Sequence, residues 1–97
     1  MKATIGNRVI ATADAEDLVM IEGNWYFPPS SVRWSELAPS ATPYTCPWKG
    51  PASYYSLVDG PEDVAWAYVT PGATAVERVG KDFAGFVAFD RAVVISE

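Results

Sequence analysis

A turn that leads into a strand is encoded by Cys46-Pro47-Trp48-Lys49-Gly50-Pro51-Ala52-Ser53-Tyr54-Tyr55. Pro47, Gly50 and Pro51 fix or bend the backbone, so the segment cannot form a regular helix. The turn also holds the only cysteine of the chain and a lysine three residues later. Because loops with unusual chemistry on a β scaffold often carry function, this turn is the first candidate for a site.

Strand and turn signals recur on both sides of this segment. Glycines and prolines separate short apolar runs, and Val64, Trp66 and Tyr68 alternate with small residues as in a strand. The predicted strands are hairpins at 2–12 and 18–27 with turns at Gly6-Asn7 and Gly23-Asn24, strands at 53–58 and 64–69, and a closing hairpin at 85–95 around Asp90-Arg91. Short helical segments are expected at 32–37, capped by Ser30 or Ser31 and ended by Pro39, and at 74–79.

Length and composition place these elements in a single domain spanning residues 1–97. The hydrophobic share of 49% and the aromatic share of 13% suffice for a packed core, since each large ring buries roughly 150–250 Å². Short strands at close spacing favour a small all-β barrel or sandwich with one or two short helical turns.

The charge balance limits the partners. Twelve acidic and seven basic residues give a net charge of -5, so the chain lacks the basic surface that binds phosphate backbones, and nucleic acid is not an expected partner. No apolar run approaches the length of about 20 residues that spans a bilayer, so a membrane is not expected either. One cysteine cannot form an internal disulfide, and no signal peptide pattern opens the sequence, which predicts a cytoplasmic location.

The residue inventory excludes the common catalytic devices. The chain has no histidine, which removes Ser-His-Asp triads, Cys-His pairs and the usual zinc sites. It also lacks a phosphate-binding P-loop and a glycine-rich dinucleotide motif. We therefore expect no metal and no cofactor. Any chemistry must come from carboxylates, one lysine, one thiol, tyrosines and backbone amides.

The sequence resembles a bacterial family, domain-of-unknown-function family 427, which also carries a nucleotidyltransferase-like label. The matching residues are Glu22, Tyr26-Phe27-Pro28, Pro39-Ser40, Thr45 to Tyr55, Glu62 to Tyr68, Pro71, and Gly85 to Phe89. The resemblance covers nearly the whole chain. Asn24-Trp25 departs from the family pattern, where this stretch is often longer and contains proline.

The resemblance implies a β-tent fold, which is a small, strongly bent antiparallel sheet or barrel. Relatives in that group often bind zinc through paired cysteines, and this chain lacks those pairs, so metal binding does not carry over. The nucleotidyltransferase-like label implies no established activity. Such transferases use clustered acidic metal ligands, and Glu62-Asp63 is the only adjacent carboxylate pair near the matched segments.

Cys46 and Lys49 each admit two interpretations. Cys46 is either a nucleophile whose thiolate Lys49 stabilises, or a small buried hydrophobe, and the lack of a histidine partner favours burial. Lys49 is either an anion-binding group or base, or a lysine that lies along an aromatic ring such as Trp48 or Tyr55. Glu22 ends an apolar strand, where an inward carboxylate needs a partner. Lys49 is the candidate partner, in a site or in a structural ion pair.

Four further residues complete the candidate ligand-binding set of Glu22, Tyr26, Cys46, Lys49, Ser53, Tyr54 and Trp66. Tyr54 and Tyr55 must point to opposite faces of their strand, so one of them is expected at a surface or pocket. Tyr26 and Trp66 have polar groups that need partners and can line a pocket. Ser53 is a candidate hydrogen-bonding group beside Lys49. No catalytic residue is assigned.

Three functions are compatible with these residues. The leading hypothesis is a module that binds a small molecule or peptide in an aromatic-lined pocket near the Cys46–Lys49 turn. The second is a small-substrate enzyme in which Lys49 and Glu22 act together, which requires the two groups to lie within about 3 Å of each other or of a shared water. The third is an interaction module that binds a partner or forms a homodimer through its surface or edge strands.

Overall fold

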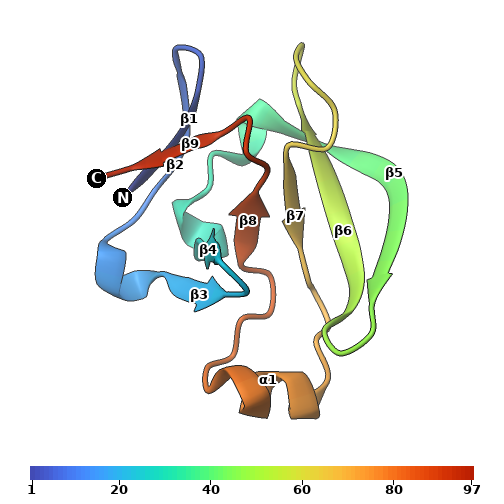
Figure 1. Ribbon diagram of the computed structural model, residues 1–97. Coiled ribbons are helices and arrows are strands. Elements are labelled where there is room, and N and C mark those ends of the chain that lie inside the picture. Colours follow the sequence, from blue (N-terminus) through green and yellow to red (C-terminus); the bar gives the residue numbers. More distant parts are fainter.

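The computed structural model describes residues 1–97 and shows antiparallel strands arranged in three sheets (Figure 1). The strands are β1 (Lys2–Ile5), β2 (Arg8–Thr12), β3 (Val19–Ile21), β4 (Asn24–Tyr26), β5 (Leu37–Cys46), β6 (Gly50–Leu57), β7 (Ala65–Ala67), β8 (Val87–Phe89) and β9 (Val94–Ser96). Their orders are β2-β1-β9, β3-β4 and β5-β6-β7-β8. One α-helix, α1 (Ala73–Val79), follows β7. The all-β prediction with short helical segments is confirmed.

Both predicted N-terminal hairpins are present. β1 pairs with β2 around Gly6, which has a φ of 58°. β3 pairs with β4 in the register Ile21↔Asn24, so the turn consists of Glu22 and Gly23 and not, as predicted, of Gly23 and Asn24. Both turn residues have positive φ, 52° and 83°. Two consecutive positive φ values are typical of the tight turns that match the twist of the flanking strands.

The prediction of a helix at 32–37 is wrong. Two 3-10 turns, η2 (Pro29–Ser31) and η3 (Trp34–Glu36), flank an extended Val32, and Leu37 already begins β5. The ten-residue strand β5 was missed because Pro39 and Pro43 argue against a central strand. β5 is an edge strand, and prolines are tolerated at edges, where a missing N–H leaves no partner unsatisfied.

The predicted closing hairpin at 85–95 is also wrong. β8 pairs with β7, whereas β9 pairs with β1 in a different sheet. The chain turns between them at Asp90, whose carbonyl accepts a hydrogen bond from Val93 N–H at 2.9 Å. Two apolar runs on either side of a turn can pair with each other or with two different strands, because their hydrophobic pattern does not specify the pairing partner.

An isolated bridge joins the β3–β4 hairpin to the edge of the four-stranded sheet. Phe27, just after β4, exchanges two backbone hydrogen bonds of 2.8 Å with Val87 of β8. The hairpin therefore lies beside β8, and α1 lies below it in the view of Figure 1. A third 3-10 turn, η1 (Ala15–Asp17), leads into the hairpin.

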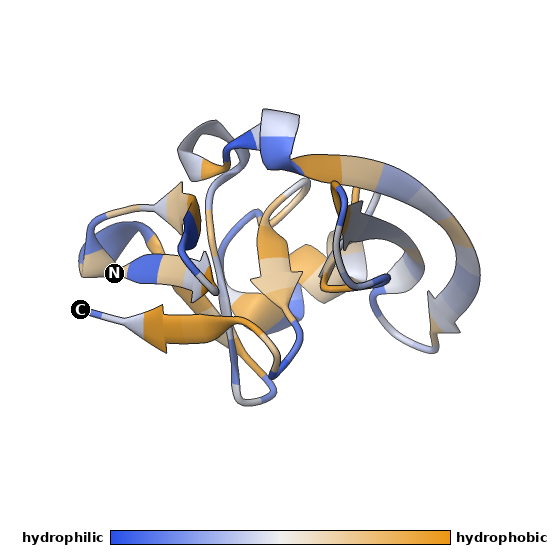
Figure 2. Cartoon of the chain, turned by 90° about the horizontal axis from the view of Figure 1, so that it is seen from above, coloured by the Kyte–Doolittle hydropathy of each residue, from blue (hydrophilic) through white to orange (hydrophobic).

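The two faces of the β5–β8 sheet carry separate cores. The first core lies toward the β1–β2–β9 sheet and includes Phe27, Leu57, Val87 and Phe89. The second core lies on the opposite face and gathers side chains from β3, β4, α1 and the segment after α1; it consists of Val19, Ile21, Tyr26, Cys46, Tyr68, Ala75, Phe83 and Ala88. Seen from above, strands in the middle of the molecule are largely hydrophobic, while several surrounding loops are hydrophilic (Figure 2).

Apart from α1 and the three 3-10 turns, the chain is extended or irregular. None of its helices has the length and apolar character needed to cross a membrane.

Candidate functional site

Strand alternation places one row of aromatic residues on the second-core face of the sheet. Tyr54 of β6 lies opposite Trp66 of β7, and Trp66 lies opposite Ala88 of β8. Tyr44 of β5 lies opposite Ala52, two residues before Tyr54, and therefore points to the same side. Tyr44, Tyr54 and Trp66 remain at least partly exposed, and we call these three residues the aromatic face.

Two of the three rings of the aromatic face are held in place by contacts. The rings of Tyr54 and Trp66 are stacked, with centroids 6.2 Å apart and an interplanar angle of 29°. The Trp66 indole N–H donates a 3.1 Å hydrogen bond to the hydroxyl of Tyr26, which is almost fully buried. Burial raises the pKa of both the Tyr26 and the Tyr54 hydroxyl above its usual value. Both hydroxyls are therefore neutral at physiological pH.

Lys49 is the one charged residue buried in the protein, with 5% of its surface exposed. It ends the turn between β5 and β6, and Gly50, with a φ of 93°, starts the next strand. The Lys49 ammonium lies 5.0 Å from the ring centroid of Trp48 and 5.0 Å from that of Tyr68. Both distances are within the range of a cation–π interaction.

The ammonium donates a hydrogen bond to the Glu22 carboxylate, so the predicted pairing of these residues is confirmed. Burial alone would lower the pKa of Lys49, but the hydrogen bond to Glu22 and the neighbouring acidic groups outweigh it and raise that pKa above its usual value. The same hydrogen bond is the main cause that holds the pKa of Glu22 below its usual value. The pair is therefore an ion pair at neutral pH.

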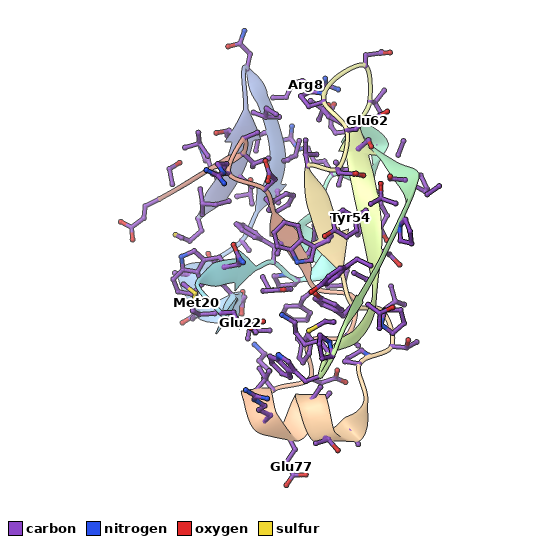
Figure 3. All side chains as sticks on the ribbon, turned by 45° about the vertical axis from the view of Figure 1, so that its right-hand side comes forward. Arg8, Met20, Glu22, Tyr54, Glu62 and Glu77 are labelled. Atoms are coloured by element: carbon purple, nitrogen blue, oxygen red, sulfur yellow. The ribbon has the colours of Figure 1, made fainter.

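The Glu22 end of the pair faces solvent. Its side chain is 55% exposed, compared with 6% for Lys49. In Figure 3, Glu22 lies at the tip of the β3–β4 hairpin, near Met20, while Tyr54 lies on the neighbouring sheet. The αL backbone at Glu22 is uncommon for a residue other than glycine, asparagine or aspartate.

Arg78 of α1 is a second cation beside the turn. Its guanidinium carbon lies 4.3 Å from the Trp48 ring centroid. The sequence pattern did not single out Arg78, and it placed Tyr68 only on the alternating face of a strand. No local pattern could have linked Arg78 to Trp48, because the position of a seven-residue helix relative to a distant turn depends on tertiary packing.

The structure brings six of the seven candidate residues to one face of the sheet, namely Glu22, Tyr26, Cys46, Lys49, Tyr54 and Trp66. Cys46 is a free, buried thiol that packs in the second core. Ser53 does not join them. It lies opposite Ala67, on the first-core face, because adjacent residues of a strand point to opposite sides.

The predicted pocket near Lys49 is absent. Side chains of the second core, including Phe83 against Tyr26 and Tyr68, fill the space beneath the rings, so the aromatic face is an open surface. The only hollow in the structure, about 450 Å³, lies elsewhere and has mostly polar walls. Its lining residues are Met1, Lys2, Thr12, Ala13, Asp14, Asp17, Pro28, Ser30, Ser31 and Glu97.

Comparison with known proteins gives a family but no activity. No curated protein matches the sequence at a significant level. A family model described as a domain of unknown function, DUF427, matches residues 1–96 and so includes every residue of the aromatic face and of the Lys49 turn. The sequence-based resemblance is confirmed, and the chain belongs to the DUF427 family.

Proposed function

We propose that this domain binds a small organic ligand with a planar group, free or as a peptide side chain, across the aromatic face and beside Lys49. The observation that carries the proposal is the stacked pair of partly exposed rings, Tyr54 and Trp66, which the Trp66–Tyr26 hydrogen bond joins to the surroundings of the buried, charged Lys49. Ligand sites in proteins combine apolar and aromatic surface with a few well-placed polar groups that fix orientation.

The rings are already ordered in the free protein. Trp66 is fixed by its hydrogen bond to Tyr26, and Tyr54 is stacked on Trp66. A ligand that stacks on them avoids most of the entropy loss of immobilising side chains, which is about 0.5–1.5 kcal/mol for each side chain ordered on binding. Tyrosine and tryptophan also offer a planar apolar surface and a polar edge to the same ligand.

The enzymatic alternative is less well supported. Lys49 and Glu22 are within contact distance, as that hypothesis required. The raised pKa of Lys49 keeps its amine protonated at neutral pH, however, so the residue has no free electron pair with which to act as a base or nucleophile. Its charge instead suits the binding of an anion.

The interaction alternative has one specific observation in its favour. Met20 and Trp25 face each other across the β3–β4 hairpin and are 47% and 36% exposed. We propose self-association through this pair as the second candidate function. Light scattering after size exclusion would then show a dimer for the wild type and a monomer for Trp25→Gln. A monomeric wild type at high concentration would remove this candidate.

A cytoplasmic location is part of the proposal. Cys46 is a free thiol within the second core, which suits a reducing compartment. Measuring the distribution of the tagged protein between cell fractions tests this point.

The binding proposal is tested by titrating isotope-labelled protein with a set of aromatic fragments and following amide and indole resonances. Ligands should shift the Trp66 indole resonance and the amides of residues 44, 52–54 and 66. Shifts confined to the polar hollow, or none at all, would contradict the proposal.

Neighbouring tyrosines on the same strand supply the matched control. Tyr54→Leu removes a ring of the aromatic face and should weaken binding at least about fivefold, since base or ring stacking on an aromatic side chain contributes about 1–3 kcal/mol. Tyr55 packs on the opposite side, against the first core and Trp34. Tyr55→Leu should therefore lower stability without changing affinity.

A further inference from the structure

The Lys49 ammonium has more hydrogen-bonding capacity than the protein uses. An ammonium group carries three N–H donors, and Glu22 is its one hydrogen-bond acceptor in the structure. The rings of Trp48 and Tyr68 cover two other sides and accept no conventional hydrogen bond. A buried cation that has already lost its hydration can bind the carboxylate of a ligand at little further desolvation cost.

The side chains around Trp48 carry more positive than negative charge. Lys49 and Arg78 both lie against its ring, and Glu22 is the acidic residue paired with this group. The protein as a whole carries a net charge of -5. A local excess of positive charge in an acidic protein selects an anion over a neutral or cationic ligand.

Glu22 is held in a way that allows its carboxylate to be replaced. Its side chain is 55% exposed and lies at the tip of a two-residue turn, with the backbone in the αL region. Lys49 donates the main hydrogen bond to this carboxylate, and a smaller hydrogen-bond contribution to its lowered pKa comes from the Trp48 side chain. Rotation of one exposed side chain would therefore free the ammonium without moving either sheet.

From these three observations we propose that the ligand of the aromatic face carries a carboxylate, and that this carboxylate binds Lys49 in the place now taken by Glu22. Glu22 then acts as an internal competitor that keeps Lys49 paired when the site is empty. This inference rests on the proposed binding function, because it specifies the chemical class of the ligand at the same surface.

The test uses two probes that differ in one group, indole-3-acetate and its neutral analogue indole-3-acetamide. Both are titrated into wild-type protein and into Glu22→Asn, with shifts at the Trp66 indole resonance as the readout. Asparagine is chosen because it tolerates αL and, followed by Gly23, forms a favoured hairpin turn, so the variant is expected to fold. Glu62→Gln is the control, because it removes one negative charge from an exposed loop at the opposite end of the molecule (Figure 3).

We expect the acid to bind the wild type about three- to tenfold more tightly than the amide, as a charge-assisted hydrogen bond requires. Glu22→Asn should tighten binding of the acid by about three- to tenfold and leave the amide unchanged, since only the acid competes for Lys49. Glu62→Gln should change neither affinity.

The outcomes separate the two proposals. Equal binding of acid and amide at the aromatic face, or weaker binding of the acid by Glu22→Asn, overturns the carboxylate inference and leaves the proposed binding function standing. Binding of neither probe at millimolar concentration, together with no response to the fragment set, overturns both.

Discussion

Lys49 and Glu22 bind each other but are buried to very different extents. The ammonium is enclosed by rings, while the carboxylate stays largely in water. Loss of either partner therefore has a different consequence. Without Glu22, a buried charge loses its counterion, whereas without Lys49, an exposed carboxylate simply becomes hydrated.

This asymmetry gives a stability prediction. Glu22→Gln should lower the free energy of unfolding by about 1–3 kcal/mol, because the Lys49 charge is left without its partner. Lys49→Met should cost less than about 1 kcal/mol, because an apolar chain of similar length packs well between the same two rings. Urea denaturation measures both values, with Glu62→Gln as a control within about 0.5 kcal/mol of wild type. A larger loss for Lys49→Met than for Glu22→Gln would contradict this account.

The hydrogen bond between Trp66 and Tyr26 joins strand β7 to strand β4. Tyr26 is 1% exposed, so its hydrogen bond from the Trp66 indole is shielded from water in the folded protein. Trp66→Phe should lower stability by about 1–3 kcal/mol. In a double-mutant cycle with Tyr26→Phe, thermal denaturation should give a coupling energy of about 1 kcal/mol. Additive effects would mean that the bond contributes nothing to the alignment of the rings.

At the scale of elements, α1 is short and depends on its ends. It begins after Gly72, which provides no side-chain cap, and ends at Gly80 in the αL conformation with a φ of 87°. Gly80 N–H donates a 2.9 Å hydrogen bond to the carbonyl of Val76. The glycine at the C-terminal end thus closes the last turn, and α1 in turn brings Arg78 to Trp48.

The same substitution at the two glycines should have opposite effects. Neither position has an atom within 4 Å of an added Cβ, so space does not distinguish them. Gly80→Ser should cost about 1–2 kcal/mol because the αL region is unfavourable for serine. Gly72→Ser should gain a few tenths of a kcal/mol (roughly 0.3), because serine supplies a helix N-cap. Thermal unfolding measures both, and equal effects would refute the assigned role of Gly80.

At the scale of the whole molecule, the titrating groups on the second-core face couple stability to pH. Glu22 has a folded-state pKa below its ordinary 4.5, mainly through the hydrogen bond from Lys49, so its contribution is present above pH 4.5 and is lost as pH falls through the folded value. Lys49 has a pKa above its ordinary 10.5, so its contribution is present below that pH and is lost as pH rises. Burial raises the pKa of Tyr26, Tyr54 and Tyr68 above 10.0. The stabilising contribution of these hydroxyls is therefore also lost as pH rises.

The contribution of these groups to the melting temperature should therefore be nearly constant between about pH 5 and pH 10. The melting temperature should fall below about pH 5 as Glu22 is protonated and above about pH 10 as Lys49 and the tyrosines lose their protons. Glu22→Gln should lose part of the acid-side decline, because the titrating carboxylate is gone. The part of the tyrosinate absorbance that comes from Tyr26, Tyr54 and Tyr68 should rise together with unfolding during alkaline titration. Ionisation of all tyrosines at ordinary pH with the protein still folded would contradict the burial of these rings.

Two residues of the aromatic face, Tyr54 and Trp66, and the Lys49 turn were predicted from local sequence, whereas Tyr44 was not singled out. The Pro47 and Gly50 positions indicated a tight turn, the adjacent Tyr54 and Tyr55 had to point to opposite faces, and the Glu22–Lys49 pairing followed from the need of an inward charge for a partner. The prediction that Ser53 lies beside Lys49 was wrong, because strand alternation turns its side chain to the first-core face.

The sequence by itself determined the all-β class, the first hairpins, the helix after β7 and the turn that carries Lys49, because each depends on local backbone preference and on a pattern of two or three neighbours. Tertiary structure alone decided that β9 pairs with β1, that β5 runs along an edge where its prolines are tolerated, and that Arg78 meets Trp48. These arrangements join residues far apart in the chain. They are selected by the burial of whole faces, which no local pattern records.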